Sequence, residues 1–327
     1  MMQKVLGIGN ALVDIMTSLE NDDTLSQLSL PKGSMQLVDK TTSAGILAKT
    51  THLKKQRSSG GSVANTIHGM ASLGIDSSFV GCVGNDELGD FFVNDLIDNH
   101  ITPRVFRGNN ETGRSIALVS PDSERTFATF LGSAVELTPE HFSASLFNGY
   151  NYLHLEGYMA PNHELMEKII KLAKEKKIIV SLDMASYNVV ETNLSFLTSI
   201  IRDYVDIVFA NEEEAKALTG QPAETAVNTI SEMCSVAVVK IGSQGSLVKR
   251  GKEEYKIAPV TAKSIDTTGA GDLYAAGFLY GLMQGLSLDK CGKIGSILAG
   301  NVIEVIGAKM DQYRWEKIRE AVKQIEN

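Results

Sequence analysis

The chain has 327 residues, of which 43% are hydrophobic and 21% are charged, a balance that is typical of a globular protein and excludes a disordered or fibrous chain. A formal net charge of −8 excludes a broad basic surface, so neither nucleic acid nor an anionic membrane is expected as a partner. Three cysteines without a CxxC pair predict no disulfide framework. With no apolar run long enough to span a membrane and no cleavable leader, we expect a cytoplasmic protein.

The first segments of the chain predict strands. Residues 4–8 form an apolar run that ends at Gly9-Asn10, which is typical of a buried strand followed by a turn. Alternating apolar and polar residues predict two further strands, over 11–19 and 34–39, in a small sheet outside the main core. Gly7 and Gly9 do not begin a dinucleotide-binding GxGxxG motif, because Leu12 stands where the third glycine is needed.

A glycine pair opens the first long helix. Gly60-Gly61 precedes apolar residues at helical spacing, Asn65 lies one turn into the helix, and Gly74 ends it. Two glycines at such an entry let the chain turn tightly against a ligand. A strand over 79–83 and a helix over 87–99 follow, and they begin an alternation of strands and helices.

A hairpin interrupts this alternation. Residues 115–120 and 125–130 are joined by the turn Pro121-Asp122-Ser123-Glu124. Arg125 either caps this hairpin or closes onto phosphates. We group the hairpin with the earlier small-sheet strands as a β lid over a core domain. The predicted core comprises residues 1–9, 41–103 and 135–327, and the predicted lid comprises residues 10–40 and 104–134.

From residue 152 onward, strands and helices alternate again, which predicts a doubly wound, mainly parallel α/β sheet with helices on both faces. The expected segments are a strand at 152–155, a helix at 162–176, a strand at 178–182, a helix at 193–202, a strand at 207–210, a helix at 212–219 and a strand at 236–241. A late hairpin over 245–257 and three helices, at 271–284, 288–305 and 314–325, close the chain.

Ligands bind outside the carboxyl ends of the strands in such sheets, and several polar residues follow predicted strands directly. Asp183 ends one strand, Asn211-Glu212-Glu213-Glu214 follows another, and Lys240 precedes Gly242 and Gly245 after a third. The alternative is a favourable charge cluster, which three glutamates at a helix start also fit.

The stretch Asp266-Thr267-Thr268-Gly269-Ala270-Gly271-Asp272 directly precedes an apolar helix. Free N–H groups at such a helix start favour an anion, and the small residues let it approach the main chain closely. Asp272 adds a carboxylate in the first turn, and an anion site with an adjacent base suits phosphoryl transfer to an alcohol. The alternative is a capped helix with a glycine-rich entry.

These motifs together resemble the pfkB/ribokinase-like family of carbohydrate and nucleoside kinases over essentially the whole chain. The 60–74 segment is similar to the N-terminal signature of the family, 266–272 to its C-terminal signature, and 211–214 to its NxxE motif. Three stretches and the lid hairpin are more similar to adenosine kinases and the sugar kinases grouped with them. These stretches are Gly7-Ile8-Gly9-Asn10 with Asp14, residues 81–89 and residues 205–211.

The resemblance implies a role for each matching residue. Asp272 would be the base, with Gly269, Ala270 and Gly271 holding the transferring phosphate. Asp14, Gly60, Gly61 and Asn65 would bind the sugar hydroxyls. Asn211 and Glu214 would organise Mg²⁺ through water, and Asp183, Lys240, Gly242 and Gly245 would complete the nucleotide site.

Two departures from the family pattern bear on the site. Asp266 and Thr268 resemble a monovalent-cation site completed near Gly307, but Lys309 stands close by where small residues are frequent. This leaves K⁺ dependence open. Asp183 stands where adenosine kinases often carry Asn and several sugar kinases carry Asp, which weakens the adenosine assignment.

We therefore expect an ATP-dependent kinase that uses Mg²⁺, and K⁺ if the cation site forms, to phosphorylate a primary hydroxyl of a sugar or ribonucleoside. The protein would be a monomer or a homodimer. We also expect the helix start and Mg²⁺ to lower the pKa of Asp272. A catalytically silent nucleoside- or sugar-binding regulator on the same fold is the alternative. A P-loop kinase is excluded, because no GxxxxGK[ST] motif occurs.

Overall fold

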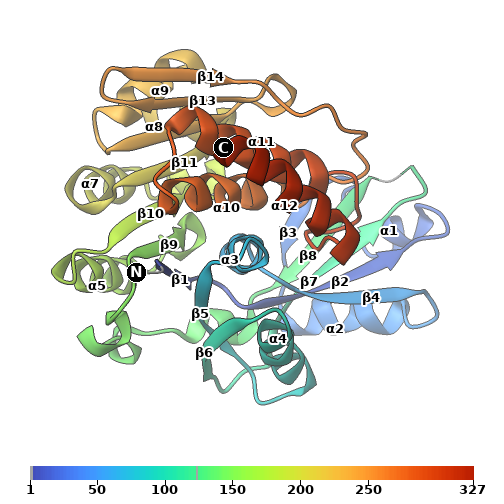
Figure 1. Cartoon of the computed structure of the whole chain (residues 1–327). Helices are drawn as coiled ribbons and strands as arrows, with labels where there is room; N and C mark the ends of the chain where they lie inside the picture. The colour runs from blue at the N-terminus through green and yellow to red at the C-terminus, as the bar shows by residue number, and fades with distance from the viewer. Residues whose placement is uncertain (1–2, 123) are drawn as a thin grey trace.

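The computed structural model describes residues 3–122 and 124–327 and contains two sheets (Figure 1). The larger sheet has nine strands in the order β14-β13-β12-β11-β10-β9-β1-β5-β6. Its strands are β1 (Lys4–Ile8), β5 (Asp76–Val83), β6 (Ile101–Arg107), β9 (Tyr152–Glu156), β10 (Ile179–Asp183), β11 (Ile207–Asn211), β12 (Val236–Lys240), β13 (Ser246–Arg250) and β14 (Glu253–Ile257). All neighbours from β12 to β6 pair in parallel, and only β13 and β14 pair antiparallel. The predicted doubly wound α/β fold is thereby confirmed.

Helices cover both faces of the large sheet. Successive residues of one strand point to opposite faces, so Val5 packs in one core and Leu6 in the other. Helices α3 (Ser62–Ser72), α4 (Glu87–Asp98), α10 (Ala270–Met283), α11 (Leu288–Val302) and α12 (Gln312–Glu326) cover the first face. Helices α5 (His163–Glu175), α7 (Leu194–Tyr204), α8 (Glu212–Thr219) and α9 (Ala223–Ser231) cover the second, and α6 (Tyr187–Thr192) precedes α7.

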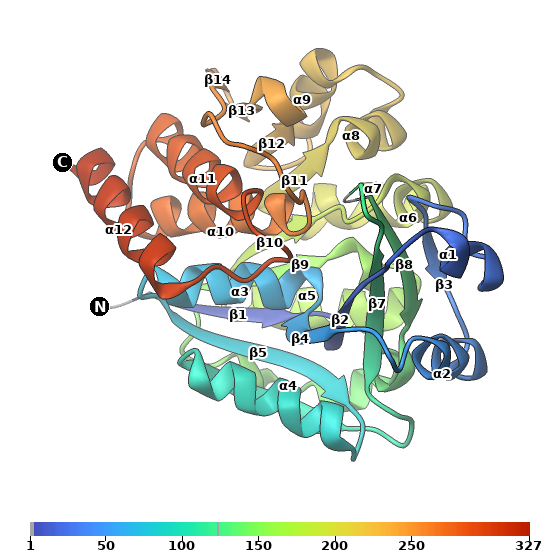
Figure 2. The same ribbon diagram turned by 90° about the vertical axis from the view of Figure 1, so that its right-hand side faces the viewer.

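The smaller sheet has five strands in the order β3-β8-β7-β2-β4. They are β2 (Leu12–Ser18), β3 (Met35–Leu37), β4 (Lys55–Gly60), β7 (Gly113–Val119) and β8 (Arg125–Phe130). Its own small core packs α1 (Asp23–Gln27) and α2 (Lys40–Lys49) against β7 and β8. Figure 2 shows these two helices on the side of the small sheet that faces away from the rest of the molecule. The small sheet therefore lies between them and the large body.

Sheet membership differs from the predicted ranges at two places. The sequence predicted no strand over β4, which pairs with β2 in the small sheet although its residues fall in the range assigned to the core. The predicted lid range begins at residue 104, whereas β6 runs to Arg107 in the large sheet. Both are edge strands, where polar residues and Pro103 are tolerated because one side of the backbone needs no partner. The division into two domains stays a prediction.

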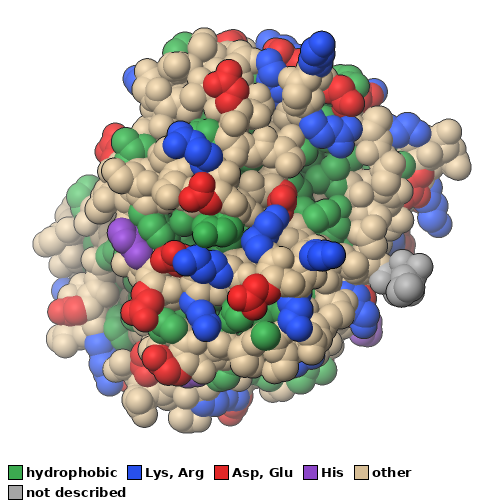
Figure 3. Space-filling view, turned by 90° about the vertical axis from the view of Figure 1, so that its left-hand side faces the viewer, with side chains coloured by type: hydrophobic (Ala, Val, Ile, Leu, Met, Phe, Trp, Pro, Cys, Tyr) green, Lys and Arg blue, Asp and Glu red, His purple; other side chains and the backbone are tan. Residues whose placement is uncertain are grey.

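Acidic and basic side chains are interspersed on the face that carries α5 and α7 (Figure 3). This agrees with the mixed, mildly acidic charge of the sequence. Among the described residues, no helix has both the length and the apolar character needed to cross a membrane.

Candidate active site

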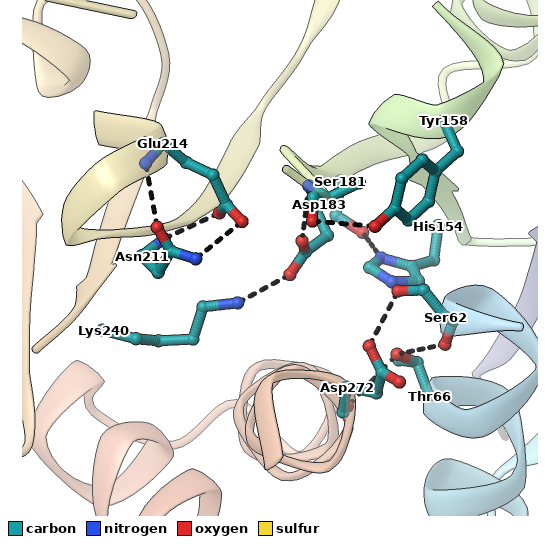
Figure 4. A network of polar contacts seen from close by, with 11 residues as sticks. Ser62, Thr66, His154, Tyr158, Ser181, Asp183, Asn211, Glu214, Lys240 and Asp272 are labelled. Atoms are coloured by element: carbon teal, nitrogen blue, oxygen red, sulfur yellow. Dashed lines mark hydrogen bonds and ion pairs between the residues drawn. The ribbon is translucent and has the colours of Figure 1, made fainter. Parts of the chain in front are cut away.

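The carboxyl ends of three neighbouring strands bring polar side chains together (Figure 4). Asp183 ends β10, Asn211 ends β11 and Lys240 ends β12, and the parallel register sets Asn211 directly opposite Lys240. A cavity of about 580 Å³ lies at this edge. Its lining also includes Gly242, Glu212, Glu213, Glu214, Gly271 and Asp272, with Ser62, Tyr158 and Ala185. Seven of the predicted site residues thus share one cavity.

Helix α10 begins at this cavity, directly after a position whose backbone conformation only glycine adopts easily. Gly269 has φ 77°, and a Cβ there would lie 2.6 Å from the Cβ of Ala308. Both constraints require glycine. The first turn that follows carries Asp272. Its Ala270 N–H donates to the Thr267 carbonyl oxygen at 3.2 Å, which leaves the N–H groups of Gly271 and Asp272 at the helix start.

Three contacts from α3 hold Asp272 in place. Ser62 Oγ donates to Oδ1 at 2.7 Å, and Asn65 Nδ2 donates to Oδ2 at 2.9 Å. Thr66 Oγ1 donates to the main-chain oxygen of Asp272 at 3.1 Å. Because both carboxylate oxygens are engaged from one side, α3 fixes the orientation of the carboxylate toward the cavity.

We expected the pKa of Asp272 to be lowered, but the surrounding protein groups raise it. Burial raises this pKa to about 6, and the nearby charge of Asp183 adds to the effect, against the hydrogen bonds from Asn65 and Ser62. Desolvation penalises the carboxylate more than the helix start favours it. The result is a stronger base than expected, one that changes protonation just below neutral pH.

Two local contacts organise the strand ends. Lys240 Nζ lies 2.8 Å from Asp183 Oδ2, and their side chains are only 16% and 7% exposed. Burial alone would lower the pKa of Lys240, but the carboxylates of Asp183, Glu214 and Asp272 outweigh it and raise the pKa. Both members of the pair therefore stay charged. Lys240 Nζ also lies 3.0 Å from the position that a Cβ at residue 271 would take, so a side chain there would displace the ammonium.

Asn211 and Glu214 form a capping box at the start of α8. The Asn211 side chain accepts from the Glu214 N–H at 2.8 Å, and Glu214 accepts from the Asn211 N–H and from Nδ2. Burial, and then the Asp183 charge, raises the pKa of Glu214 to about 7. Glutamates 212–214 and Asp183 leave the cavity acidic, and Lys240 is the one lysine or arginine among the described residues that line it.

This acidity bears on the divalent metal that the family resemblance implies. Among the described residues, no three His, Cys, Asp or Glu side chains are arranged to hold a metal by themselves. Carboxylates at the cavity edge nevertheless suit Mg²⁺ that is held mainly by water and substrate phosphates. Glu214, Asp183 and Asn211 fit that role.

The predicted sugar-binding residues meet where the small sheet joins α3. Asp14 in β2 lies over Gly60 so closely that a Cβ there would come within 2.3 Å of Oδ2. Gly61 has φ 97°, and its Cβ would meet the Asn10 carbonyl oxygen at 2.2 Å. Asn65 joins this group to Asp272. These four residues are therefore neighbours of the Asp272 carboxylate, although none of them lines the cavity described above.

A buried glutamate supports this region. Glu156, at the end of β9, is 1% exposed and accepts from Asn10 N at 2.8 Å, Asn10 Nδ2 at 2.7 Å and Val63 N at 3.1 Å. Burial raises its pKa to about 7, against these hydrogen bonds. The carboxylate thus fixes both Asn10 and the start of α3.

A second cavity, of about 590 Å³, adjoins this region and shares Tyr158 with the first. Asn10, Asn162, His163 and Glu164 are polar residues of its lining. Its apolar residues include Leu131, Ala134, Val135, Leu137, Met159 and Pro161. The two cavities meet at an exposed tyrosine, which therefore contributes to the walls of both.

The residues of this arrangement that were not among the predicted site residues include Ser62, Tyr158, Asn10 and Glu156. A charged residue ending the apolar run Tyr152-Leu-His-Leu-Glu156 is a signal that could have identified Glu156, because strand carboxyl ends face ligands. Gly245 was predicted to flank the nucleotide, but it does not line the cavity. A Cβ at that position would meet the Ile257 carbonyl oxygen at 1.9 Å, so packing against β14 already requires this glycine.

Asp266 and Thr268 do not form an open cation site. The Asp266 side chain is 0% exposed, its Oδ1 accepts from Thr268 N at 2.8 Å and its Oδ2 accepts from Gly307 N. The guanidinium of Arg125 contacts Oδ1 directly. Arg125 therefore neither caps its own hairpin nor points to solvent. Monovalent-cation binding at Asp266 does not fit these contacts.

Comparisons with known proteins agree with this geometry. Residues 34–312 match the family model described as pfkB family carbohydrate kinase. The chain is similar to an uncharacterized sugar kinase of Archaeoglobus fulgidus, with 29% identity over 74% of this chain and 96% of that protein. A "probable sugar kinase" of Rhizobium etli CFN 42 has 33% identity and a TM-score of 0.89 over 98% of this chain and 99% of the other. An adenosine kinase of Sinorhizobium meliloti has 33% identity and a TM-score of 0.88 over 98% of this chain and 100% of the other.

The family model covers most of the chain, including residues 266–272 at the start of α10 beside the cavity. The resemblance inferred from the sequence is confirmed, including the likeness to adenosine kinases and related sugar kinases. The chain belongs to the pfkB family of carbohydrate kinases and has their ribokinase-like fold.

Proposed function

We propose that the protein transfers the γ-phosphoryl group of ATP to a primary hydroxyl of a sugar or a ribonucleoside. The observation that carries this proposal is the position of Asp272. Its carboxylate is fixed by Ser62 and Asn65 at the start of α10, in one cavity with the Asp183–Lys240 pair. A base thus lies beside free helix N–H groups and a buried ammonium, which is what an in-line phosphoryl transfer requires.

In this reaction the acceptor oxygen forms a bond to the γ-phosphorus while the bond from that phosphorus to ADP breaks. Asp272 takes the hydroxyl proton, and its pKa of about 6 keeps the carboxylate ionised at neutral pH. The Lys240 ammonium and the N–H groups at the start of α10, that of Gly271 among them, would face the transferring group, whereas the Ala270 N–H already donates to Thr267 O. Mg²⁺ bound with the nucleotide would supply charge neutralisation. Glu214, with Asn211, would hold the ion through water.

The acceptor would bind by its hydroxyl groups to Asp14 and Asn65, near Asn10. Carboxylate and amide groups can accept and donate to adjacent hydroxyls. The second cavity, with its largely apolar residues beyond Asn10, favours a ribonucleoside, whose base would occupy it. A silent binding protein on the same fold is not favoured, because the 266–272 motif is intact.

The test is Asp272→Asn in a coupled assay of ADP release over adenosine, other nucleosides, ribose, fructose and related hexoses. We expect turnover to fall by about a thousand-fold, the usual contribution of a general base, while ATP still binds in a titration. Asp289→Asn is the matched control, because Asp289 also lies in the first turn of a helix but pairs with Lys293 at the surface. Retained turnover in Asp272→Asn would contradict the proposal.

A further inference from the structure

The first residue of strand β8 contacts residues 266–269, the loop directly before α10, which we call the signature loop. Arg125 is the first residue of β8, and its side chain is 8% exposed. The guanidinium Nη1 contacts Asp266 Oδ1, and the Asp266 side chain has no exposed surface. This buried ion pair connects the small sheet with the loop that carries Gly269 and Asp272.

Asp266 is the centre of a closed set of contacts. Thr268 N donates to Oδ1 at 2.8 Å, so the carboxylate holds its own loop. Gly307 N donates to Oδ2, so the same carboxylate also holds the loop that follows α11. Both oxygens thus accept from main-chain N–H groups, and the guanidinium gives the negative charge a buried counter-ion.

A monovalent cation and a guanidinium satisfy the same requirement at this position. Each carries one positive charge, and a buried carboxylate that joins two loops needs one such charge nearby. Arginine stays charged at all physiological pH values and is the residue type best suited to buried pairs. A second cation beside Arg125 would bring two like charges together in a site that excludes water, which is unfavourable at low dielectric.

We propose that Arg125 permanently takes the place of the monovalent cation that the family resemblance implies at Asp266, so that turnover requires no K⁺. The inference rests on the proposed kinase activity and concerns what keeps its signature loop in place. Arg125 acts here as a positioning residue, through Asp266 and the two loops that Asp266 joins. The lid sheet thus contributes to the shape of the phosphate site through its own residue.

The first experiment compares initial rates of the wild-type protein in KCl, NaCl and tetramethylammonium chloride, each at about 100 mM so that ionic strength is constant. We expect the three rates to agree within about two-fold, since the site already holds its charge. Activation by K⁺ of more than about five-fold would overturn the inference. The absence of ADP release in every salt and with every acceptor would instead contradict the proposed function itself.

The second experiment uses Arg125→Ala, which leaves Asp266 with its N–H partners but without a counter-ion. We expect this variant to lose at least about ten-fold in rate in tetramethylammonium chloride and to recover part of that loss in KCl, because K⁺ can then bind. Arg114→Ala is the matched control, since Arg114 is also a buried arginine of the small sheet but pairs with Glu111 and Ser43. Its rate should show no such recovery.

A readout independent of activity covers the case in which Arg125→Ala is inactive in every salt. Its midpoint of thermal unfolding should be about 2 °C higher in KCl than in tetramethylammonium chloride, because an ion that binds the folded state stabilises it. The midpoints of the wild-type protein and of Arg114→Ala should not differ between the two salts. An Arg125→Ala variant that responds to K⁺ neither in rate nor in midpoint would overturn the inference.

Discussion

The two sides of the candidate site differ in whether their buried carboxylates form an ion pair. At the ends of β10, β11 and β12, Lys240 neutralises Asp183, and both groups stay ionised. Near the small sheet, Asp14 and Glu156 form no ion pair with any described residue, and burial raises the pKa of each to about 7. The first side therefore suits a charged ligand such as a nucleotide. The second side suits uncharged hydroxyl groups, and its carboxylates, Asp14 and Glu156, change protonation near neutral pH.

The substitution Lys240→Met tests this difference most strongly, because Lys240 is the one lysine or arginine among the described residues that line the nucleotide-side cavity. In Lys240→Met, Asp183 and Glu214 would face an incoming triphosphate with no opposing charge. A hydrogen bond between charged groups contributes up to about 3 kcal/mol, so losing the contact of the ammonium with the phosphates should lower kcat/KM for ATP roughly a hundred-fold. Breaking the buried pair should also lower the free energy of unfolding by about 3 kcal/mol. The acceptor KM, measured in the same coupled assay, should change by less than about two-fold.

The double variant Lys240→Met/Asp183→Asn separates stability from function. It removes both charges, so most of the stability lost in Lys240→Met should return, and chemical denaturation can measure this. Activity should stay low, because the ammonium is still absent. If activity returned together with stability, Lys240 would act only by neutralising Asp183.

Asp14→Asn tests the other side with a smaller expected effect. Asp14 should bind hydroxyl groups as a carboxylate, and hydrogen bonds to charged groups contribute about 1.5–3 kcal/mol. We therefore expect the acceptor KM to rise about ten- to a hundred-fold, with little change in the KM for ATP. Asp122→Asn is the control, because Asp122 lies at the exposed turn of the lid hairpin and pairs with Lys32. Equal effects on both KM values would contradict the separation into two sides.

Ser62→Ala changes the pH dependence of catalysis. The hydrogen bond from Ser62 lowers the pKa of Asp272, against the larger effect of burial, so its loss should raise that pKa above the present value of about 6. A base acts only when deprotonated, so the acid limb of kcat/KM should move to higher pH, by about half a unit. Thr66→Val is the control, since Thr66 donates to the main chain of Asp272 and not to its carboxylate. An unmoved limb in Ser62→Ala would count against Asp272 as the titrating base.

Glu156→Gln should have the smallest effect, and on stability rather than rate. The folded-state pKa of Glu156, about 7, lies above the ordinary glutamate value of 4.5. Protonation therefore favours the folded state, and this contribution to stability is lost as pH rises between these two values. Glutamine cannot titrate, so the decrease in the unfolding midpoint from about pH 5 to about pH 8 should be smaller by about 2 °C. The same substitution at the exposed Glu224 should leave the decrease unchanged.

The fold was largely predictable because each buried strand of the large sheet is a short apolar run. Strands β9 to β12 are buried on both faces, which leaves few polar residues to obscure the pattern. The sequence predicted none of the elements β4, β6, α1, α2, α6 and α9. Strand β4 reads Lys55-Gln-Arg-Ser-Ser-Gly60 and exists because β2 pairs with it, so tertiary pairing and not local preference decides its structure.

The candidate site also has features that the local sequence predicts and features that it does not. The start of α10 and the capping box of α8 are local in sequence, so spacing alone placed Asp272, Asn211 and Glu214. The contact between Arg125 and Asp266 joins residues far apart in the chain, and no local pattern indicates it. Burial also reversed the expected direction of the Asp272 pKa shift, because desolvation depends on packing that spacing does not reveal.

Tyr158 belongs to the walls of both cavities and is 38% exposed. A single molecule that passes this side chain could therefore occupy both volumes at once. In such a molecule, a ribose would link an aromatic group in one cavity to a polyphosphate in the other. Both groups would then bind in a single association step, which avoids the entropic cost of a second one.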